Sequence, residues 1–238
     1  PRILGVLNTR SGRVSISHHF PASFQVEATK LFFDQSSDKL WIGTFSGGLY
    51  FYNFLNKSFY ATRVPSFPRQ PVLAITPNTD STCLVGIDGG GVWELSKNGD
   101  RVLSVLKEDI DNSNSLQGNG VYDIYKDGEN RVWICTFTGG LSYYDAQNQG
   151  IQQVRHQVGN RNSLVNNSIN RILEDKNGKL WFATNNGLSS WEPKTNRWKN
   201  YLQNNEMGRA VAFLSLCEDN NGRIWAGTYS SGVYVIDA

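Results

Sequence analysis

The sequence LWIGTFSGGLYFY at residues 40–52 recurs with few changes as VWICTFTGGLSYY at residues 132–144. In both copies an apolar run with a tryptophan ends at a double glycine and resumes with aromatic residues. Alignment on the tryptophan gives five copies, spaced 43, 49, 48 and 44 residues apart, and the second copy has leucine instead. The five anchor positions are Trp41, Leu84, Trp133, Trp181 and Trp225. A period of this length is typical of repeat architectures such as propellers.

Each copy divides into four strand-length runs, which we name a to d in chain order. In the fourth copy they read SINRILE, KLWFAT, GLSSWE and RWKNYL, and Gly, Asn, Asp and Pro mark the breaks between them. The a–b link DKNG predicts a tight hairpin turn, in which Asp175 accepts backbone N–H groups and Gly178 takes a positive φ. No segment shows a helical apolar period, so the sequence predicts an all-β chain.

Strand b carries a large and a small residue on one face. Trp133 and Cys135 lie two residues apart, as do Trp181 and Ala183, and side chains two apart on a strand share a face. This pairing lets a neighbouring sheet approach closely, while Ile134 and Phe182 make the opposite face apolar too. A four-stranded sheet buried on both faces and repeated in register is a propeller blade.

The expected fold is therefore a β-propeller with four full blades and a partial blade at each end. The chain begins and ends in runs that align with strand c, which predicts a fragment rather than a closed ring. A five-bladed ring, closed by residues 13–17 as strand d of the last blade, is the alternative. The predicted blades span residues 1–18 (partial), 27–62, 71–107, 120–156, 168–202 and 210–238 (partial).

Composition excludes several classes of function. The formal net charge is +2 and Lys and Arg form no run, which argues against nucleic-acid binding. The three cysteines lie in apolar runs without C-x-x-C spacing, so they are expected to be buried and to bind no metal. His18, His19 and His156 form no ligand or triad pattern. We expect no metal and no cofactor.

Catalysis on glycans would need two converging carboxylates. The a–b turns account for Asp127, Asp175 and Asp219, and the ends of strand c account for Asp145 and Asp237. The remaining candidates form no recognisable pair, so we expect no enzyme; they are Asp88, Glu108, Asp109, Asp111, Asp123 and Glu206.

Two longer stretches resemble a known family. They are NSLQGNGVYDIYKDGENRVWICTFTGGLSYYD from Asn114 and NSLVNNSINRILEDKNGKLWFATNNGLSSWE from Asn162. They are similar to the periplasmic two-component-regulator propeller repeats of bacterial hybrid histidine kinases, and the likeness runs from about Ala28 to the C-terminus. The second copy departs from the pattern, with Leu84 for Trp and PNTDST for the acidic turn.

The resemblance implies a seven-bladed propeller and a sensor rather than an enzyme. It implies a periplasmic receptor region that binds an oligosaccharide, forms a homodimer, and signals through a membrane segment outside this sequence to a kinase. The remaining blades and domains of the receptor would be its partners. A protein-interaction scaffold and, less favoured, a glycan-active enzyme are the alternatives, because a propeller fold alone does not decide function.

The predicted ligand site lies on the face where the b–c turns and the long d–a loops emerge, since loops on a rigid scaffold commonly carry binding groups. Aromatic rings suit sugar faces, and amides and guanidinium groups suit hydroxyls or anionic substituents. The residues that directly follow strand b are Phe45, Asp88, Phe137, Asn185 and Tyr229. The d–a loops add Arg63, Arg69, Asn114, Arg161, Asn162 and Arg209. The alternative is that the aromatics fill joints between blades and that the asparagines cap their own loops.

Overall fold

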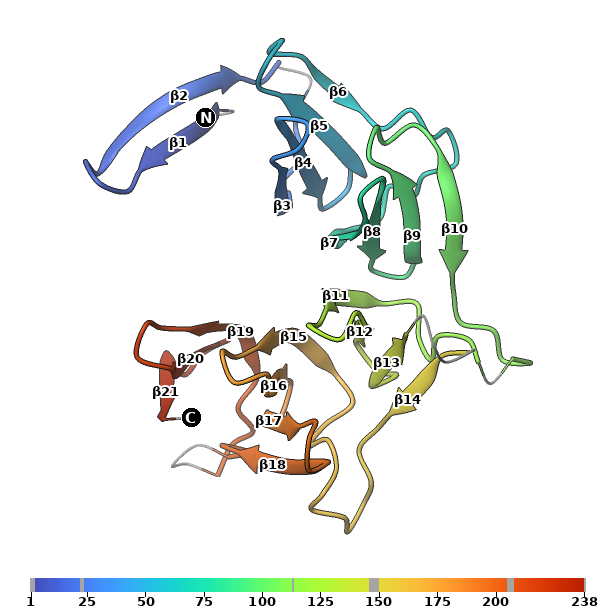
Figure 1. Ribbon diagram of the computed structural model, residues 1–238, viewed down its shortest axis with the longest axis vertical. Helices are drawn as coiled ribbons and strands as arrows, with labels where there is room; N and C mark the ends of the chain where they lie inside the picture. The colour runs from blue at the N-terminus through green and yellow to red at the C-terminus, as the bar shows by residue number, and fades with distance from the viewer. Residues whose placement is uncertain (1–2, 22–23, 113, 146–149, 205–207, 238) are drawn as a thin grey trace.

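The computed structural model describes residues 3–21, 24–112, 114–145, 150–204 and 208–237, and every regular element within them is a β-strand. Among these residues no helix is long and apolar enough to span a membrane. The strands form six antiparallel sheets arranged around an arc (Figure 1).

Four of the sheets are complete four-stranded blades, and in each of them the strands pair in chain order. Blade 1 consists of β3 (Ala28–Asp34), β4 (Lys39–Thr44), β5 (Leu49–Asn53) and β6 (Phe59–Ala61). Blade 2 consists of β7 (Val72–Thr79), β8 (Thr82–Ile87), β9 (Gly91–Ser96) and β10 (Val102–Leu106). Blade 3 consists of β11 (Val121–Lys126), β12 (Val132–Thr136), β13 (Leu141–Tyr144) and β14 (Gln152–Val154). Blade 4 consists of β15 (Ile169–Glu174), β16 (Leu180–Thr184), β17 (Gly187–Glu192) and β18 (Arg197–Tyr201).

A smaller sheet stands at each end of the arc. The first hairpin pairs β1 (Ile3–Asn8) with β2 (Arg13–His19), and the last sheet contains β19 (Phe213–Glu218), β20 (Arg223–Thr228) and β21 (Val233–Asp237). The prediction of four full blades between two partial ones is confirmed. The five-bladed alternative is wrong, because β2 is hydrogen-bonded to β1 and not to the last sheet, and a wide gap separates the two ends (Figure 1).

The core lies between neighbouring sheets. Trp41 and Trp133 are 0% and 1% exposed and pack with residues of the next blade. Trp181 is 0% exposed and shares its face of β16 with Ala183, which packs against the last sheet. The small residue on the same face is needed for close packing: a Cβ added at Gly43 would lie 2.7 Å from a methyl group of Val72. Leu84 fills the tryptophan position of blade 2 and is 2% exposed, so the divergent copy still forms a blade.

The a–b turns of blades 3 and 4 and of the last sheet share one device. In blade 3, Asp127 accepts the backbone N–H groups of Glu129 and Arg131, and its second oxygen accepts the indole N–H of Trp133 at 2.7 Å. Asp175 and Asp219 make the same bond to their tryptophans, each at 2.9 Å. The carboxylate therefore joins the turn to the anchor tryptophan, a link that the turn pattern alone did not predict.

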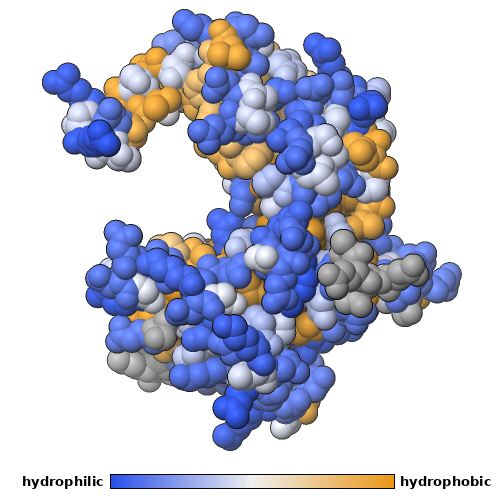
Figure 2. All heavy atoms as spheres, in the orientation of Figure 1, coloured by the Kyte–Doolittle hydropathy of each residue, from blue (hydrophilic) through white to orange (hydrophobic). Residues whose placement is uncertain are grey.

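The inner strand a of every blade contains a bulge at the same place. The pairing of strands a and b shifts register once near the start of β3, β7, β11, β15 and β19. These strands border a central hollow, which is open on one side in the space-filling view (Figure 2). A bulge bends the strand and redirects side chains. The extra residue in each bulge is Thr29, Leu73, Tyr122, Asn170 or Leu214.

Candidate ligand-binding rim

The residue that directly follows strand b holds the same backbone position in all five copies. Its N–H donates to the carbonyl of the residue immediately before strand a of the same sheet, at 2.9 to 3.0 Å. The pairs are Phe45 to Glu27, Asp88 to Pro71, Phe137 to Gly120, Asn185 to Ser168 and Tyr229 to Ala212. We call these five donor residues the slot residues and the edge that they form the rim. The b–c turns and the ends of the d–a loops therefore meet on one face.

Threonine and glycine shape the turn beyond most slots. Thr136 Oγ1 donates to the carbonyl of Gly140 at 2.9 Å, and Gly140 has φ of +84°, which favours glycine. The same hydrogen bond forms from Thr44 to Gly48, from Thr184 to Gly187 and from Thr228 to Gly232. Local turn chemistry thus fixes the slot backbone without using the slot side chain.

The three aromatic slot residues are exposed. Phe45, Phe137 and Tyr229 are 57%, 42% and 79% exposed, so Phe45 and Phe137, each of which has a following blade, do not fill the joints between blades. Phe137 stacks on Tyr122, the bulge residue of β11, with ring centroids 5.2 Å apart and an interplanar angle of 29°. Tyr122 was missed by the sequence reasoning, although it is an aromatic residue on an inner strand beside a predicted slot.

The two polar slots differ from each other. Asp88 Oδ1 lies 3.0 Å from where a Cβ on Gly120 would stand, so a larger residue at Gly120 would push the carboxylate aside. Burial first, and the charge of Asp88 second, raise the pKa of Tyr122. Asn185 accepts a hydrogen bond at 2.8 Å from Asn170, which also donates to the carbonyl of Phe213. Asn185 therefore helps to join blade 4 to the last sheet.

Two of the predicted arginines belong to the rim. Arg69 lies two residues before Pro71 and lines a pocket of about 450 Å³ together with Ser46, Gly47 and Tyr50 of blade 1. Arg209 lies close in sequence to Val211, whose carbonyl accepts the N–H of Gly187 at the b–c turn of blade 4. Both arginines are exposed.

The other loop residues lie away from the rim. Arg63 stands 5.8 Å from the ring of Tyr60 and shares a pocket of about 240 Å³ with Asn98 and Asp100, in the c–d turn of blade 2. Asn162 accepts the N–H of Trp198, just after the c–d turn of blade 4.

The corresponding Asn114 lies beside Gly150, near the c–d turn of blade 3. The first halves of these d–a loops therefore run along the outside of the next blade. Arg161, next to Asn162, is exposed in the same outer segment, between β14 and β15 (Figure 1).

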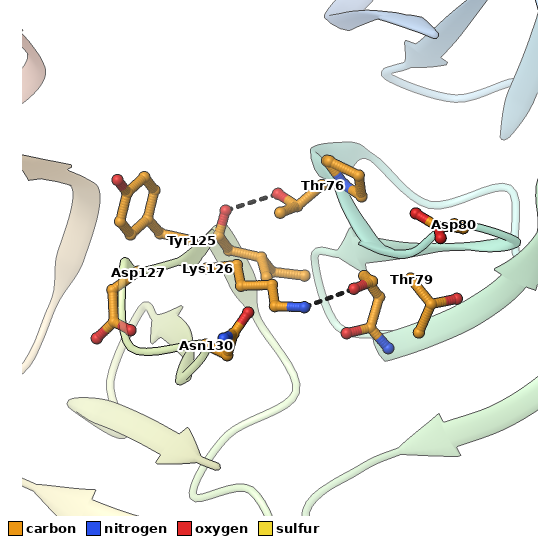
Figure 3. Close-up of a pocket in the computed structure, with 10 residues that line it drawn as sticks. Thr76, Thr79, Asp80, Tyr125, Lys126, Asp127 and Asn130 are labelled. Atoms are coloured by element: carbon orange, nitrogen blue, oxygen red, sulfur yellow. Dashed lines mark hydrogen bonds between the residues drawn. The ribbon is translucent and has the colours of Figure 1, made fainter. Parts of the chain in front are cut away.

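A pocket of about 750 Å³ opens on the opposite face, between blades 2 and 3 (Figure 3). At the next joint, Glu174 of blade 4 accepts the N–H of Gly128 in the a–b turn of blade 3, and Glu218 does the same for Lys176. Blade 3 has Lys126 in the glutamate position, and its Nζ donates to the carbonyl of Asn78 at 2.6 Å. Two features of the sequence could have revealed this exchange: a lysine stands at position 126 where later copies have glutamate, and copy two lacks the acidic a–b turn.

The described residues contain no group of three or more His, Cys, Asp or Glu side chains placed to hold a metal ion. Cys83 and Cys135 are buried as expected, but Cys217 is exposed. Cys217 lies opposite Trp225 on the neighbouring strand of the last sheet, and Trp225 is 38% exposed. No further sheet in the described structure covers the face of the sheet that carries these two side chains. Glu206 lies outside the described residues.

Comparison with known proteins agrees with this architecture. The family model described as two component regulator propeller matches residues 115–138, 163–186 and 209–230. Each matched segment runs from a d–a loop through strands a and b and ends one residue after a slot residue. No curated protein matches the chain by sequence.

Solved structures show the same fold. The extracellular domain of BT3049, described as a hybrid two component system from B. thetaiotaomicron, superposes with a TM-score of 0.72 at 20% identity, over 98% of this chain and 33% of that one. The C-terminal WD40 domain of Sif2 gives a TM-score of 0.62 at 14% identity, over 99% and 74% of the two chains. The chain thus spans about a third of the length of the BT3049 domain. Together the comparisons show that the chain has a β-propeller fold and that three of its segments match the two component regulator propeller model.

Proposed function

We propose that the chain is a sensor region of an extracytoplasmic two-component receptor, and that it binds an oligosaccharide at the rim without transforming it. In this proposal the region belongs to a seven-bladed periplasmic propeller in a homodimeric receptor, which signals to a histidine kinase outside this chain. The match to two component regulator propeller repeats supports the sensor role. The shared fold with an extracellular domain of BT3049 supports the location.

The observation that carries the binding proposal is the set of exposed aromatic rings in equivalent slots. Phe45, Phe137 and Tyr229 are fixed by backbone hydrogen bonds and yet keep 42% or more of their surface exposed. Uncovered rings on a fixed backbone offer flat apolar surface for a sugar face, while Asp88 and Arg69 on the same edge offer an acceptor and donors for hydroxyls. An exposed apolar surface on a rigid scaffold is a common mark of a binding site.

The enzyme alternative receives little support from the acidic residues. Asp123 is the only buried residue among the described candidates for a catalytic acid. Its carboxylate already meets Lys30 and Arg171 and accepts the N–H of Ile172 at 3.2 Å. A carboxylate engaged in this way is committed to ion pairing rather than to proton transfer to a substrate.

Titration calorimetry of the intact protein against a panel of oligosaccharides tests the proposal. Phe137→Ala should weaken the best ligand by about three- to tenfold, the loss of one aromatic contact. Arg69→Ala should weaken it as well, whereas Arg63→Ala, in the same loop but away from the rim, should leave affinity unchanged.

Equal affinities for the Arg69 and Arg63 variants, with unchanged melting midpoints, would place the ligand elsewhere, with the pocket beside Lys126 as the next site to examine. Chromatography of the recovered ligand decides the enzyme alternative, because cleavage products would contradict a purely sensory role.

A further inference from the structure

Three charged side chains from three different blades meet at the central hollow. Lys30 Nζ lies 3.6 Å from Asp123 Oδ1, and Arg171 Nη1 lies 3.2 Å from the same oxygen. They stand on β3, β11 and β15, which border the hollow in Figure 1. All three directly follow the bulge in strand a, opposite Gly43, Cys135 and Ala183.

The lysine reaches past a whole blade because blade 2 has a small residue at the same position. Ala74 pairs with Gly86 just after the bulge of β7 and is fully buried. No long side chain of blade 2 therefore stands between Lys30 and Asp123. Sequence reasoning could not assemble this cluster, because its members are 48 or more residues apart and only the curvature of the arc brings them together.

The cluster has two cations and one anion, and the anion is the deepest of the three. The side chain of Asp123 is 7% exposed, whereas those of Lys30 and Arg171 are 22% and 35% exposed. A molecule that enters the hollow therefore meets positive charge first. Arg171 uses one nitrogen for Asp123, and the described part of the chain gives its other N–H groups no further partner.

The two cations share a single carboxylate. Burial, as the largest cause, lowers the pKa of Lys30; Asp123 raises it, and Arg171 lowers it by less than Asp123 raises it. Because the cluster carries one positive charge in excess, a second anion placed between the cations would be attracted to both. The planar fork of an arginine matches carboxylate and sulfate oxygens in two-point contacts.

We propose that Lys30 and Arg171 bind an anionic substituent, a carboxylate or a sulfate, on an oligosaccharide held at the rim. The inference rests on the proposed function and adds the class of ligand: acidic rather than neutral glycans. Lys30 and Arg171 supply the charge, the aromatic slots supply the stacking surface, and Asp88 is left to accept sugar hydroxyls.

Calorimetry with matched ligand pairs tests this inference on the intact protein. One pair is oligogalacturonate and its fully methyl-esterified form, and the other is a sulfated galactan oligosaccharide and its desulfated form. At least one acidic member should bind about tenfold more tightly than its neutral partner, the value of a charge-assisted hydrogen bond. Which pair shows the difference distinguishes carboxylate from sulfate, and added salt should reduce it.

Variants with opposite expected signs separate binding from mere support of the fold. Arg171→Gln should abolish the preference for the acidic member, whereas Asp123→Asn should strengthen it, because the competing carboxylate is gone while an oxygen acceptor for Ile172 remains. A purely structural cluster would lose affinity in both variants or in neither. Arg161→Gln, an exposed arginine away from the hollow, is the matched control and should change nothing.

The outcomes keep the two proposals apart. Equal binding of neutral and acidic members, sensitive to Phe137→Ala, would overturn the anionic class and retain the sensor at the rim. A preference for acidic ligands that survives Arg171→Gln and Lys30→Gln would overturn the assignment to this cluster. Failure of every oligosaccharide to bind would overturn both proposals.

Discussion

Blade 3 and the last sheet contain the same three-residue unit in different surroundings. In blade 3, Arg131 contacts Asp127 at 2.6 Å and lies 5.6 Å from the ring of Trp133. In the last sheet, Arg223 contacts Asp219 at 2.8 Å and lies 5.6 Å from the ring of Trp225. The local geometry is the same, and both tryptophans donate to their aspartates.

Burial is what differs between the two units. Trp133 is 1% exposed and packs between its own sheet and blade 4, where its ring lies 4.6 Å from Tyr143 and 5.4 Å from Trp191. Trp225 is 38% exposed, as are neighbours on its face such as Val235 at 44%. The repeat therefore specifies a blade locally, and the adjoining sheet determines how much that blade contributes to stability.

Thiol labelling should show the largest contrast between the two regions. In the native state Cys217, on the open face of the last sheet, should react with an aromatic disulfide reagent at pH 8. Cys83 should react at least about a thousandfold more slowly, because it needs an opening of about 5 kcal/mol or more, and burial raises its pKa to about 12. Cys135, whose pKa burial also raises, should behave like Cys83. Slow reaction of Cys217 in the intact protein would mean that another part of the protein covers this face.

Truncation of the two tryptophans should differ in cost. Trp133→Ala should lower the free energy of unfolding by about 3–5 kcal/mol, since it leaves a cavity between packed sheets. Trp225→Ala should cost about 1–2 kcal/mol, because less apolar surface is buried there. Denaturant melts measure both values, and equal costs would contradict the difference in packing.

Removal of the turn carboxylate should follow the same order with smaller values. Asp127→Asn should cost about 2–3 kcal/mol, because a buried charge-assisted network loses its anion. Asp219→Asn should cost less, since the carboxylate and Arg223 are open to solvent. Thermal melts at neutral pH compare the two, and a larger loss for Asp219→Asn would reverse the ranking of the two turns.

The pH dependence of the last sheet should give the smallest effect. The indole N–H of Trp225, with Arg223 and two backbone N–H groups, holds the pKa of Asp219 well below its ordinary value of 3.8. The folded state therefore binds fewer protons than the unfolded state near pH 3, so this contribution is complete above about pH 5 and declines as the pH falls. Asp219→Asn should flatten the decline in melting temperature below pH 4, and an unchanged slope would show that the bond does not form in solution.

The parts predictable from sequence are those that each copy encodes within itself. The anchors, the hairpin aspartates and the positions directly after strand b all follow from alternation and turn chemistry in about 45 residues. Leu84 shows how far this extends, because the apolar pattern of copy two predicts its blade even without tryptophan. The exposure of Cys217 was mispredicted, since an apolar strand reveals nothing of whether a neighbouring sheet covers it.

Features that involve more than one blade could not be predicted from the pattern within a single repeat. Arg63 and Arg69 belong to one loop, yet the curvature of the arc places one beside the next blade's c–d turn and the other at the rim. The contact of Lys30 with Asp123 likewise depends on how three blades are tilted toward one hollow. Contacts between side chains of different blades depend on how the blades are arranged in the arc, so they cannot be predicted from one repeat alone.

The backbone hydrogen bond behind each slot residue has a consequence for how such a protein can change. Because the N–H of the slot residue, and not its side chain, ties the b–c turn to strand a, phenylalanine, tyrosine, asparagine and aspartate all occupy the position in one molecule. At the exposed aromatic slots the fold therefore depends on backbone atoms, and the side chain can be exchanged at little cost in stability. Asn185 is the exception, because its side chain also helps to join blade 4 to the last sheet. Point substitutions at Phe45, Phe137 and Tyr229 could thus change what this edge of the molecule contacts while the blades stay as they are.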